Sequence, residues 1–129
     1  MATVVVADDD DDLREVFVQA LILAGHQAHP AADGLAAIEA VRAERPDLLL
    51  LDVWMPGLTG FDVLEALRHD AVGSRLKVIV VSNLGDADSR LSAFEAGASA
   101  YLVKGRSLAE MLELVAQTLE DSEGLGALA

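Results

Sequence analysis

The sequence contains no cysteine, few aromatic residues and far fewer basic than acidic side chains. Its 129 residues include one Trp, one Tyr and three Phe. Without cysteine, the chain has no disulfide, no thiol nucleophile and no thiolate metal ligand. Nine Lys and Arg residues against 22 Asp and Glu residues give a formal net charge of −13. Because this charge repels phosphate backbones, we expect no direct contact with nucleic acid.

Long apolar runs are also missing. Segments 4–7 (VVVA), 48–51 (LLLL) and 78–81 (VIVV) are apolar, but each is far too short to span a bilayer. The first residues lack the basic, apolar and small-residue pattern of a signal peptide. We therefore predict a cytoplasmic protein without membrane association. With 53% hydrophobic residues, the chain can bury the core of one domain.

Short apolar strands alternate with amphipathic helices along the chain. We expect a weak edge strand where Pro30 occurs, because proline fits poorly in a central strand. The last predicted helix has a buried stripe of Leu108, Met111, Leu112, Val115 and Leu119. The five strands are expected at 3–7, 27–31, 48–52, 77–82 and 100–104.

Five strand–helix units predict an α/β fold with a parallel sheet covered by helices on both faces. Flavodoxin-like and Rossmann windings both fit this pattern, and the missing G-x-G-x-x-G after the first strand disfavours dinucleotide binding. We expect the domain at 1–121 and a short C-terminal tail at 122–129 that frays, since the tail has no periodicity.

Polar side chains stand at the ends of the four clear strands: Asp8 and Asp9, Asp52, Ser82, and Lys104. The carboxyl ends of parallel strands share one edge of the sheet, where ligands bind. Two carboxylates ~4 Å apart repel by about 4 kcal/mol at an effective dielectric near 20. A hard cation such as Mg²⁺ relieves this repulsion. A carboxylate can then attack a phosphoryl group while the ammonium and hydroxyl groups bind its oxygens.

The sequence resembles a response-regulator receiver domain (CheY-like) over essentially its whole length. The resemblance lies in the acidic pair after the first strand, in VVSN at 80–83 and in AGASAYLVK at 96–104. Its strongest motif is D-x-x-M-P-G-x-x-G, formed by Asp52, Met55, Pro56, Gly57 and Gly60. The resemblance implies one flavodoxin-like (βα)5 domain with strand order 2-1-3-4-5.

The resemblance also implies a metal site. Asp52 would be the phosphoacceptor and would bind Mg²⁺ directly together with Asp9 and the backbone carbonyl of Trp54. Asp8 would act on the metal through water. The phosphoryl donor would be a phosphohistidine of a sensor histidine kinase or a histidine phosphotransfer protein.

Three further roles follow from the resemblance. Ser82 would hydrogen-bond to the phosphoryl group, Lys104 would pair with it, and Tyr101 would turn inward as Ser82 moves. A downstream protein would bind the face formed by helix 86–96, strand 100–104 and the helix after 107. The protein would catalyse only its own phosphorylation and dephosphorylation. Whether phosphorylation drives dimerisation stays open, as does whether the chain stands alone or belongs to a longer protein.

Several of these residues and the chain as a whole also allow other interpretations. Asp10, Asp11 and Asp12 fit a helix cap better than a metal site. A pseudo-receiver that binds partners without phosphorylation is an alternative, as is an aspartate-nucleophile phosphatase. Aspartate-nucleophile phosphatases commonly have a second acidic residue two positions after the nucleophile, where it serves as general acid. Trp54 stands at that position here, which disfavours the phosphatase interpretation. Gly105 stands where many receivers have a cis-proline, so we expect a trans or mobile peptide.

Overall fold

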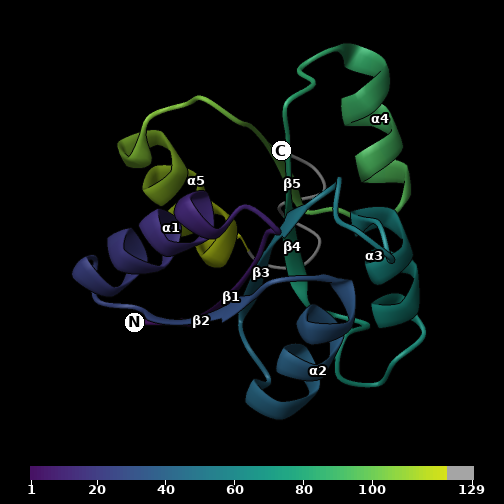
Figure 1. Ribbon diagram of the computed structural model, residues 1–129, viewed down its shortest axis with the longest axis horizontal. Helices are drawn as coiled ribbons and strands as arrows, with labels where there is room; N and C mark the ends of the chain where they lie inside the picture. Colours follow the sequence, from purple (N-terminus) through teal and green to yellow (C-terminus); the bar gives the residue numbers. More distant parts are fainter. Residues whose placement is uncertain (122–129) are drawn as a thin grey trace.

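The computed structural model describes residues 1–121 and has five strands and five helices in strict alternation (Figure 1). The tail predicted at 122–129 lies outside the described residues. Within them, no helix combines the length and apolar character needed to cross a membrane. The elements are β1 (Thr3–Ala7), α1 (Asp11–Leu23), β2 (Gln27–Ala31), α2 (Gly34–Glu44), β3 (Leu48–Asp52), α3 (Gly60–Arg68), β4 (Lys77–Ser82), α4 (Ala87–Glu95), β5 (Ala100–Val103) and α5 (Leu108–Glu120).

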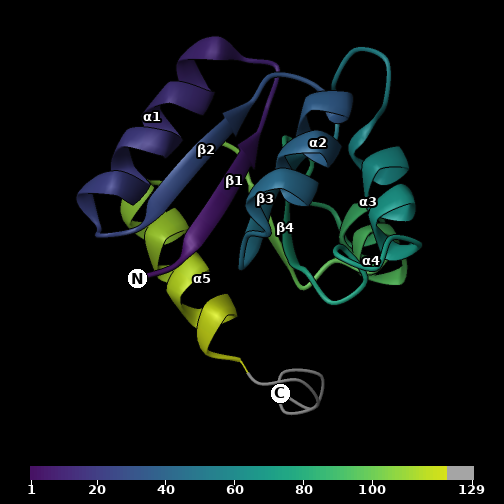
Figure 2. The same cartoon turned by 90° about the horizontal axis from the view of Figure 1, so that it is seen from below.

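The strands form one parallel sheet in the order β2-β1-β3-β4-β5. This order confirms the flavodoxin-like winding. Helices α1 and α5 cover one face of the sheet, and α2, α3 and α4 cover the other (Figures 1 and 2). Since β1, β3, β4 and β5 follow one another in this order and all run parallel, their carboxyl ends are neighbours along one edge of the sheet.

Alternation along the strands separates the core into two clusters. Val5, Leu49 and Val80 face the cluster that contains Val63 of α3. Val4, Leu50 and Ile79 face the opposite cluster, which contains Phe17 of α1 and Val115 of α5. The central strands are therefore apolar on both sides, which explains their continuous runs of Val and Leu.

Side-chain caps set the start of each helix. The Asp10 carboxylate accepts the backbone N–H groups of Asp12 and Leu13 at 3.0 and 3.1 Å, so the predicted acidic cap of α1 is confirmed and is Asp10. Thr59 and Asp62 form a reciprocal capping box at α3. The prediction for Leu108 was wrong. As the first residue of α5 it is 40% exposed, whereas Met111 one turn later is buried.

Strand β2 is an edge strand, as Pro30 predicted. The Gln27 N–H donates to the Ala2 carbonyl at 2.9 Å, and the Ala31 carbonyl accepts from the Asp8 N–H at 3.1 Å. Residues 27 and 31 thus direct their backbone N–H and C=O groups toward β1. Because these directions alternate along a strand, the nitrogen of Pro30 faces away from the sheet.

Candidate functional site

The carboxyl ends of four strands bring the predicted residues to one edge of the sheet. Asp8 and Asp9 follow β1, Asp52 ends β3 and Ser82 ends β4. Lys104 directly follows β5, which is one residue shorter than predicted because it ends at Val103. Parallel pairing aligns these ends, so the five residues lie at the same edge of the sheet.

Three carboxylates and one ammonium group converge there. Asp8, Asp9 and Asp52 each offer a carboxylate oxygen, and these oxygens lie within 4.8 Å of one another. The Lys104 Nζ atom lies 3.1 Å from Asp52 Oδ1 and 3.5 Å from Asp8 Oδ2. Asp8 and Asp52 are buried, whereas Asp9 is exposed. The site is therefore a buried acidic pair with one open side.

Local hydrogen bonds hold Asp8 in place. Its Oδ1 atom accepts the Asp10 N–H at 2.9 Å, and its carbonyl accepts from the Arg14 guanidinium at 2.8 Å. The run of five aspartates is thus divided by function. Asp8 and Asp9 belong to the acidic site, and Asp10 caps α1.

Burial and charge shift the pKa of the central residues. Burial, and next the charge of Asp8, raise the pKa of Asp52 from its usual 3.8 to about 6, although Lys104 opposes the change. Burial acts to lower the pKa of Lys104, but the hydrogen bond and charge of Asp52, with the charge of Asp8, raise it overall. The cluster thus carries more negative charge than Lys104 neutralises, so it favours a bound cation.

We expect Asp52→Asn to raise the free energy of unfolding by about 1–2 kcal/mol at pH 7.5 in EDTA. A pKa rise from 3.8 to about 6, which already includes the opposing effect of Lys104, corresponds to at most about 3 kcal/mol. Part of this gain is lost because Asn places an amide NH₂ group where one carboxyl oxygen stood. An acid whose folded pKa is raised destabilises the folded state when ionised, so the gain must shrink as the pH falls from 6 toward 3.8.

Urea unfolding across this pH range measures the effect, with the exposed Asp12→Asn as the matched control. A pH-independent difference between Asp52→Asn and the unmodified protein would contradict the electrostatic explanation.

The donor set fits a divalent metal. Among the described residues, Asp52 Oδ2 is buried and has no hydrogen-bond partner, so its lone pairs are available. Asp8, Asp9 and Asp52 provide the hard oxygen ligands that Mg²⁺ prefers, and the exposed side leaves room for water ligands. The predicted Trp54 carbonyl lies in the β3–α3 loop, two residues beyond Asp52, and its role as a ligand stays a prediction.

Gly60 brings this loop back against the end of β3. Its N–H donates to the Val53 carbonyl at 2.8 Å. A Cβ atom at Gly60 would lie 2.5 Å from the Asp52 carbonyl oxygen and 2.9 Å from the Val53 Cα. The backbones approach so closely that only glycine fits, which explains the last Gly of the D-x-x-M-P-G-x-x-G motif.

Ser82 and Tyr101 are linked through the backbone of one residue of the β4–α4 loop, Leu84. The Leu84 N–H donates to Ser82 Oγ at 3.1 Å, and the Tyr101 hydroxyl donates to the Leu84 carbonyl. Both side chains are buried, and the Lys104 N–H donates to the Ser82 carbonyl at 2.7 Å. The peptide between Lys104 and Gly105 is trans, as predicted. Sequence reasoning missed the position of Leu84 in this link.

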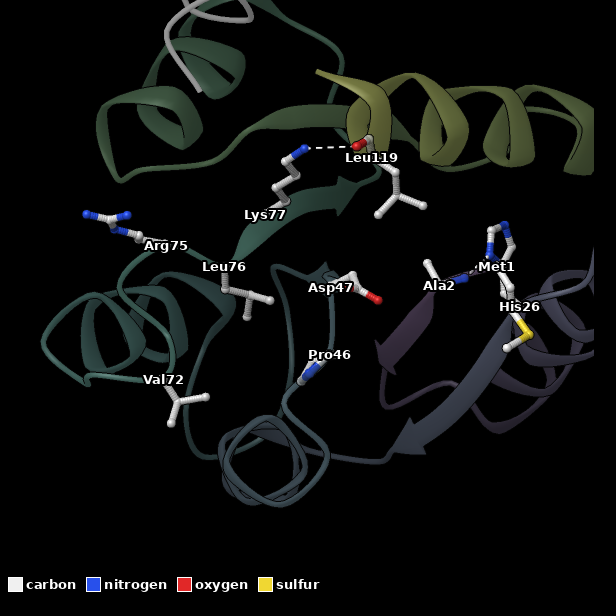
Figure 3. A pocket seen from close by; sticks show the side chains of 10 residues that line it. All are labelled: Met1, Ala2, His26, Pro46, Asp47, Val72, Arg75, Leu76, Lys77 and Leu119. Atoms are coloured by element: carbon white, nitrogen blue, oxygen red, sulfur yellow. Dashed lines mark hydrogen bonds between the residues drawn. The ribbon is translucent and has the colours of Figure 1, made fainter. Parts of the chain in front are cut away.

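A second hollow lies at the opposite ends of the strands (Figure 3). It has a volume of about 550 Å³, and two of its charged side chains make local hydrogen bonds. The Lys77 Nζ atom donates to the Leu119 carbonyl at 3.0 Å, and an Asp47 carboxylate oxygen accepts the Thr3 N–H at 2.9 Å. These contacts hold neighbouring segments together. In the acidic site, by contrast, Asp52 Oδ2 has no hydrogen-bond partner and is available to bind a cation.

Comparisons with known proteins identify the family of this chain. The family model "Response regulator receiver domain" matches residues 4–116. The chain is 36% identical to response regulator MprA of Mycobacterium ulcerans, over 98% of this chain and 56% of that protein. It is 39% identical to the transcriptional regulatory protein PrrA of Mycobacterium tuberculosis, over 87% of this chain and 47% of that protein. The chain thus spans about half the length of the curated relatives it matches.

Solved structures show the same fold. The chemotaxis protein CheY4 of Vibrio cholerae superposes with a TM-score of 0.87 at 26% identity, covering 92% of this chain and 98% of that one. A putative response regulator of Chloroflexus aurantiacus gives a TM-score of 0.87 at 30% identity, covering 93% and 98%. The chain therefore belongs to the family of response-regulator receiver domains of two-component signalling.

Proposed function

We propose that Asp52 accepts a phosphoryl group from a phosphohistidine. The observation that carries the proposal is the position of Lys104, whose ammonium lies 3.1 Å from Asp52 beside two further carboxylates. An oxygen of Asp52 would attack phosphorus, the phosphorus–nitrogen bond would break, and the imidazole would leave with the electron pair. The only products are the aspartyl phosphate and the free histidine.

The other residues of the site have separate tasks in this transfer. The Lys104 ammonium and the Ser82 hydroxyl would bind the phosphoryl oxygens, where negative charge accumulates. Asp8, Asp9, Asp52 and the Trp54 carbonyl would hold Mg²⁺. When bound, the metal would neutralise the carboxylates and the phosphoryl oxygens.

The proposed partners follow from this chemistry. The donor would be a sensor histidine kinase or a histidine phosphotransfer protein, which places the reaction in the cytoplasm. A downstream protein would bind the face formed by α4, β5 and α5. The chain would turn over no external substrate. The residue two positions after Asp52 is the exposed Trp54, which cannot act as the general acid that protonates a leaving group.

Labelling with radioactive acetyl phosphate and Mg²⁺ tests the proposed function. We expect the unmodified protein to gain an acid-stable, base-labile label, and we expect Asp52→Asn to lose essentially all of it. Asp12→Asn is the matched control, because it removes a carboxylate of the same run that lies outside the acidic site. Equal labelling of Asp52→Asn and the unmodified protein would exclude Asp52, and no labelling at all would favour a pseudo-receiver.

We predict a long-lived aspartyl phosphate, because two apolar side chains flank the site. Trp54 and Leu84 are 63% and 50% exposed, and both line a cavity of about 150 Å³ that also contacts Ser82. They would hinder an attacking water. Trp54→Asn combined with Leu84→Glu should accelerate dephosphorylation about tenfold or more, because a polar group there can position water.

The decay of the radioactive label measures the dephosphorylation rate. Leu35→Glu is the control, since it adds the same charge at an exposed position on α2. An unchanged decay rate in the double variant would show that Trp54 and Leu84 do not shield the phosphoryl group.

A further inference from the structure

The carbonyl group between Asp8 and Asp9 is held by a side chain from α1. The Arg14 Nη1 atom donates to this carbonyl oxygen at 2.8 Å, and the contact is partly buried. The oxygen belongs to the peptide bond that joins Asp8 to Asp9, and a peptide bond is planar. A restraint on this oxygen therefore fixes the plane in which the chain passes from one carboxylate of the acidic site to the next.

Asp8 and Asp9 differ in how the structure holds them. Asp8 is buried, its N–H donates to the Ala31 carbonyl at 3.1 Å, and its carboxylate accepts the Asp10 N–H at 2.9 Å. Asp9 is exposed and lies between Asp8 and the residue that caps α1. The position of the Asp9 carboxylate therefore depends on the backbone on either side of it.

The same guanidinium also binds the run of aspartates at a second point. The Arg14 Nη2 atom lies 2.6 Å from Asp11 Oδ1, and the Arg14 side chain is 17% exposed. Arg14 is the only Lys or Arg among the first 41 residues of the sequence. Neighbouring carboxylates repel each other, so the planar guanidinium restrains a loop, from Asp8 to Asp11, that charge alone would spread apart.

We propose that Arg14 is a positioning residue for the metal site. By holding the peptide between Asp8 and Asp9, it keeps the Asp9 carboxylate beside the other two acids of the site, whose oxygens lie within 4.8 Å of one another. Lys104 contacts Asp8 and Asp52 through their carboxylates, and Arg14 acts on the backbone that leads to Asp9. This inference rests on the magnesium site of the proposed function.

Charge and position predict opposite effects for the loss of Arg14. Removing a positive charge beside a cation site would tighten Mg²⁺ binding on charge alone. Loss of the restraint would weaken binding, because the cation would then have to order the loop. Residues that orient metal ligands from outside the ligand set typically change metal affinity 10–100-fold. We therefore expect Arg14→Met to raise the Kd for Mg²⁺ about tenfold.

Titration of the ¹⁵N-labelled protein with MgCl₂, followed through the amide resonances of the acidic site, measures this Kd. Arg42→Met is the matched control, because it removes the same charge from α2, where Arg42 pairs with Asp70, and it should leave the Kd within about twofold. Arg14→Lys keeps the charge but lacks the fork, so it should recover only part of the loss. If circular dichroism shows that Arg14→Met does not fold, Arg14→Gln serves in its place.

Two further readouts separate positioning from a general loss of structure. Without Mg²⁺, the Asp10 amide that donates to Asp8 should exchange with solvent several times faster in Arg14→Met, while the Leu50 amide resonance in β3 should stay in place. Labelling by acetyl phosphate should be about tenfold slower at limiting Mg²⁺. At saturating Mg²⁺ it should come within about twofold of the unmodified protein, because the bound metal restores the arrangement of the loop.

Equal or tighter Mg²⁺ binding by Arg14→Met would overturn the inference, and so would unchanged exchange of the Asp10 amide. Absence of Mg²⁺ binding in the unmodified protein would overturn it together with the metal site. Failure of the proposed phosphoryl transfer is seen separately, as missing label on Asp52 in the unmodified protein, and it leaves the magnesium titrations and the exchange rates fully interpretable.

Discussion

Gly60→Ala is expected to lower the free energy of unfolding by about 2–3 kcal/mol, as overpacking against a rigid neighbour does. The added Cβ would lie 2.5 Å from the Asp52 carbonyl oxygen, and a backbone atom cannot move aside as a flexible side chain can. Because the displaced atom belongs to Asp52 itself, we also expect slower phosphoryl incorporation. Urea unfolding and acetyl phosphate labelling measure the two effects.

Gly85→Ala is the matched control for this substitution. A Cβ at Gly85 would meet only the tip of Val103, at 3.2 Å, so we expect a change within about 0.5 kcal/mol. If Gly60→Ala were as stable as this control, the β3–α3 loop would have enough freedom to accept a side chain. The close approach would then not explain the glycine.

Arg68→Met is expected to lower the free energy of unfolding by about 3 kcal/mol. The Arg68 guanidinium is partly buried and donates to the carbonyls of Gly73 and Leu76 at 2.8 Å and of Gly97 at 2.6 Å. Burial lowers the pKa of Arg68, yet arginine keeps its charge in proteins. Methionine fills a similar volume but leaves three partly buried carbonyls without this donor. One hydrogen bond to a charged group contributes about 1.5–3 kcal/mol, and we expect water to replace part of the other two because the site is only partly buried.

Thermal and urea unfolding of Arg68→Met test this expectation. The exposed Arg75→Met, in the same α3–β4 connection, is the control and should change stability by less than about 0.5 kcal/mol. Arg68→Lys should recover only part of the loss, because an ammonium lacks the planar fork that reaches separate carbonyls. Equal stability of Arg68→Met and Arg75→Met would show that water replaces the guanidinium without cost.

Strand and helix patterns predicted most of the fold because burial on both faces leaves a clear signature. Continuous apolar runs identified β1, β3 and β4, and Pro30 identified the edge strand. The acidic cap of α1 was predictable because Asp10, Asp11 and Asp12 directly precede an amphipathic helix, and Asp10 has this role. Leu108 was misjudged because periodicity does not show where the first turn of a helix leaves the core.

The candidate site was predictable because parallel strands align their ends. Asp8, Asp9, Asp52 and Lys104 could be grouped before any distance was known. By contrast, Arg68 and Arg90 gave no recognisable signal. Their contacts with Gly97 and Tyr101 join segments that no motif relates, and an arginine in a helix is usually a solvated surface residue.

Edge strand β2 also affects how copies of this domain can associate. Its outer margin lacks an amide hydrogen at Pro30, so an incoming strand would find a gap in the row of donors along that margin. Edge-to-edge growth of the sheet through β2 is therefore disfavoured by its own sequence. Two copies are therefore expected to pair through other surfaces, and this acidic domain is less prone to fibre-like aggregation along that side.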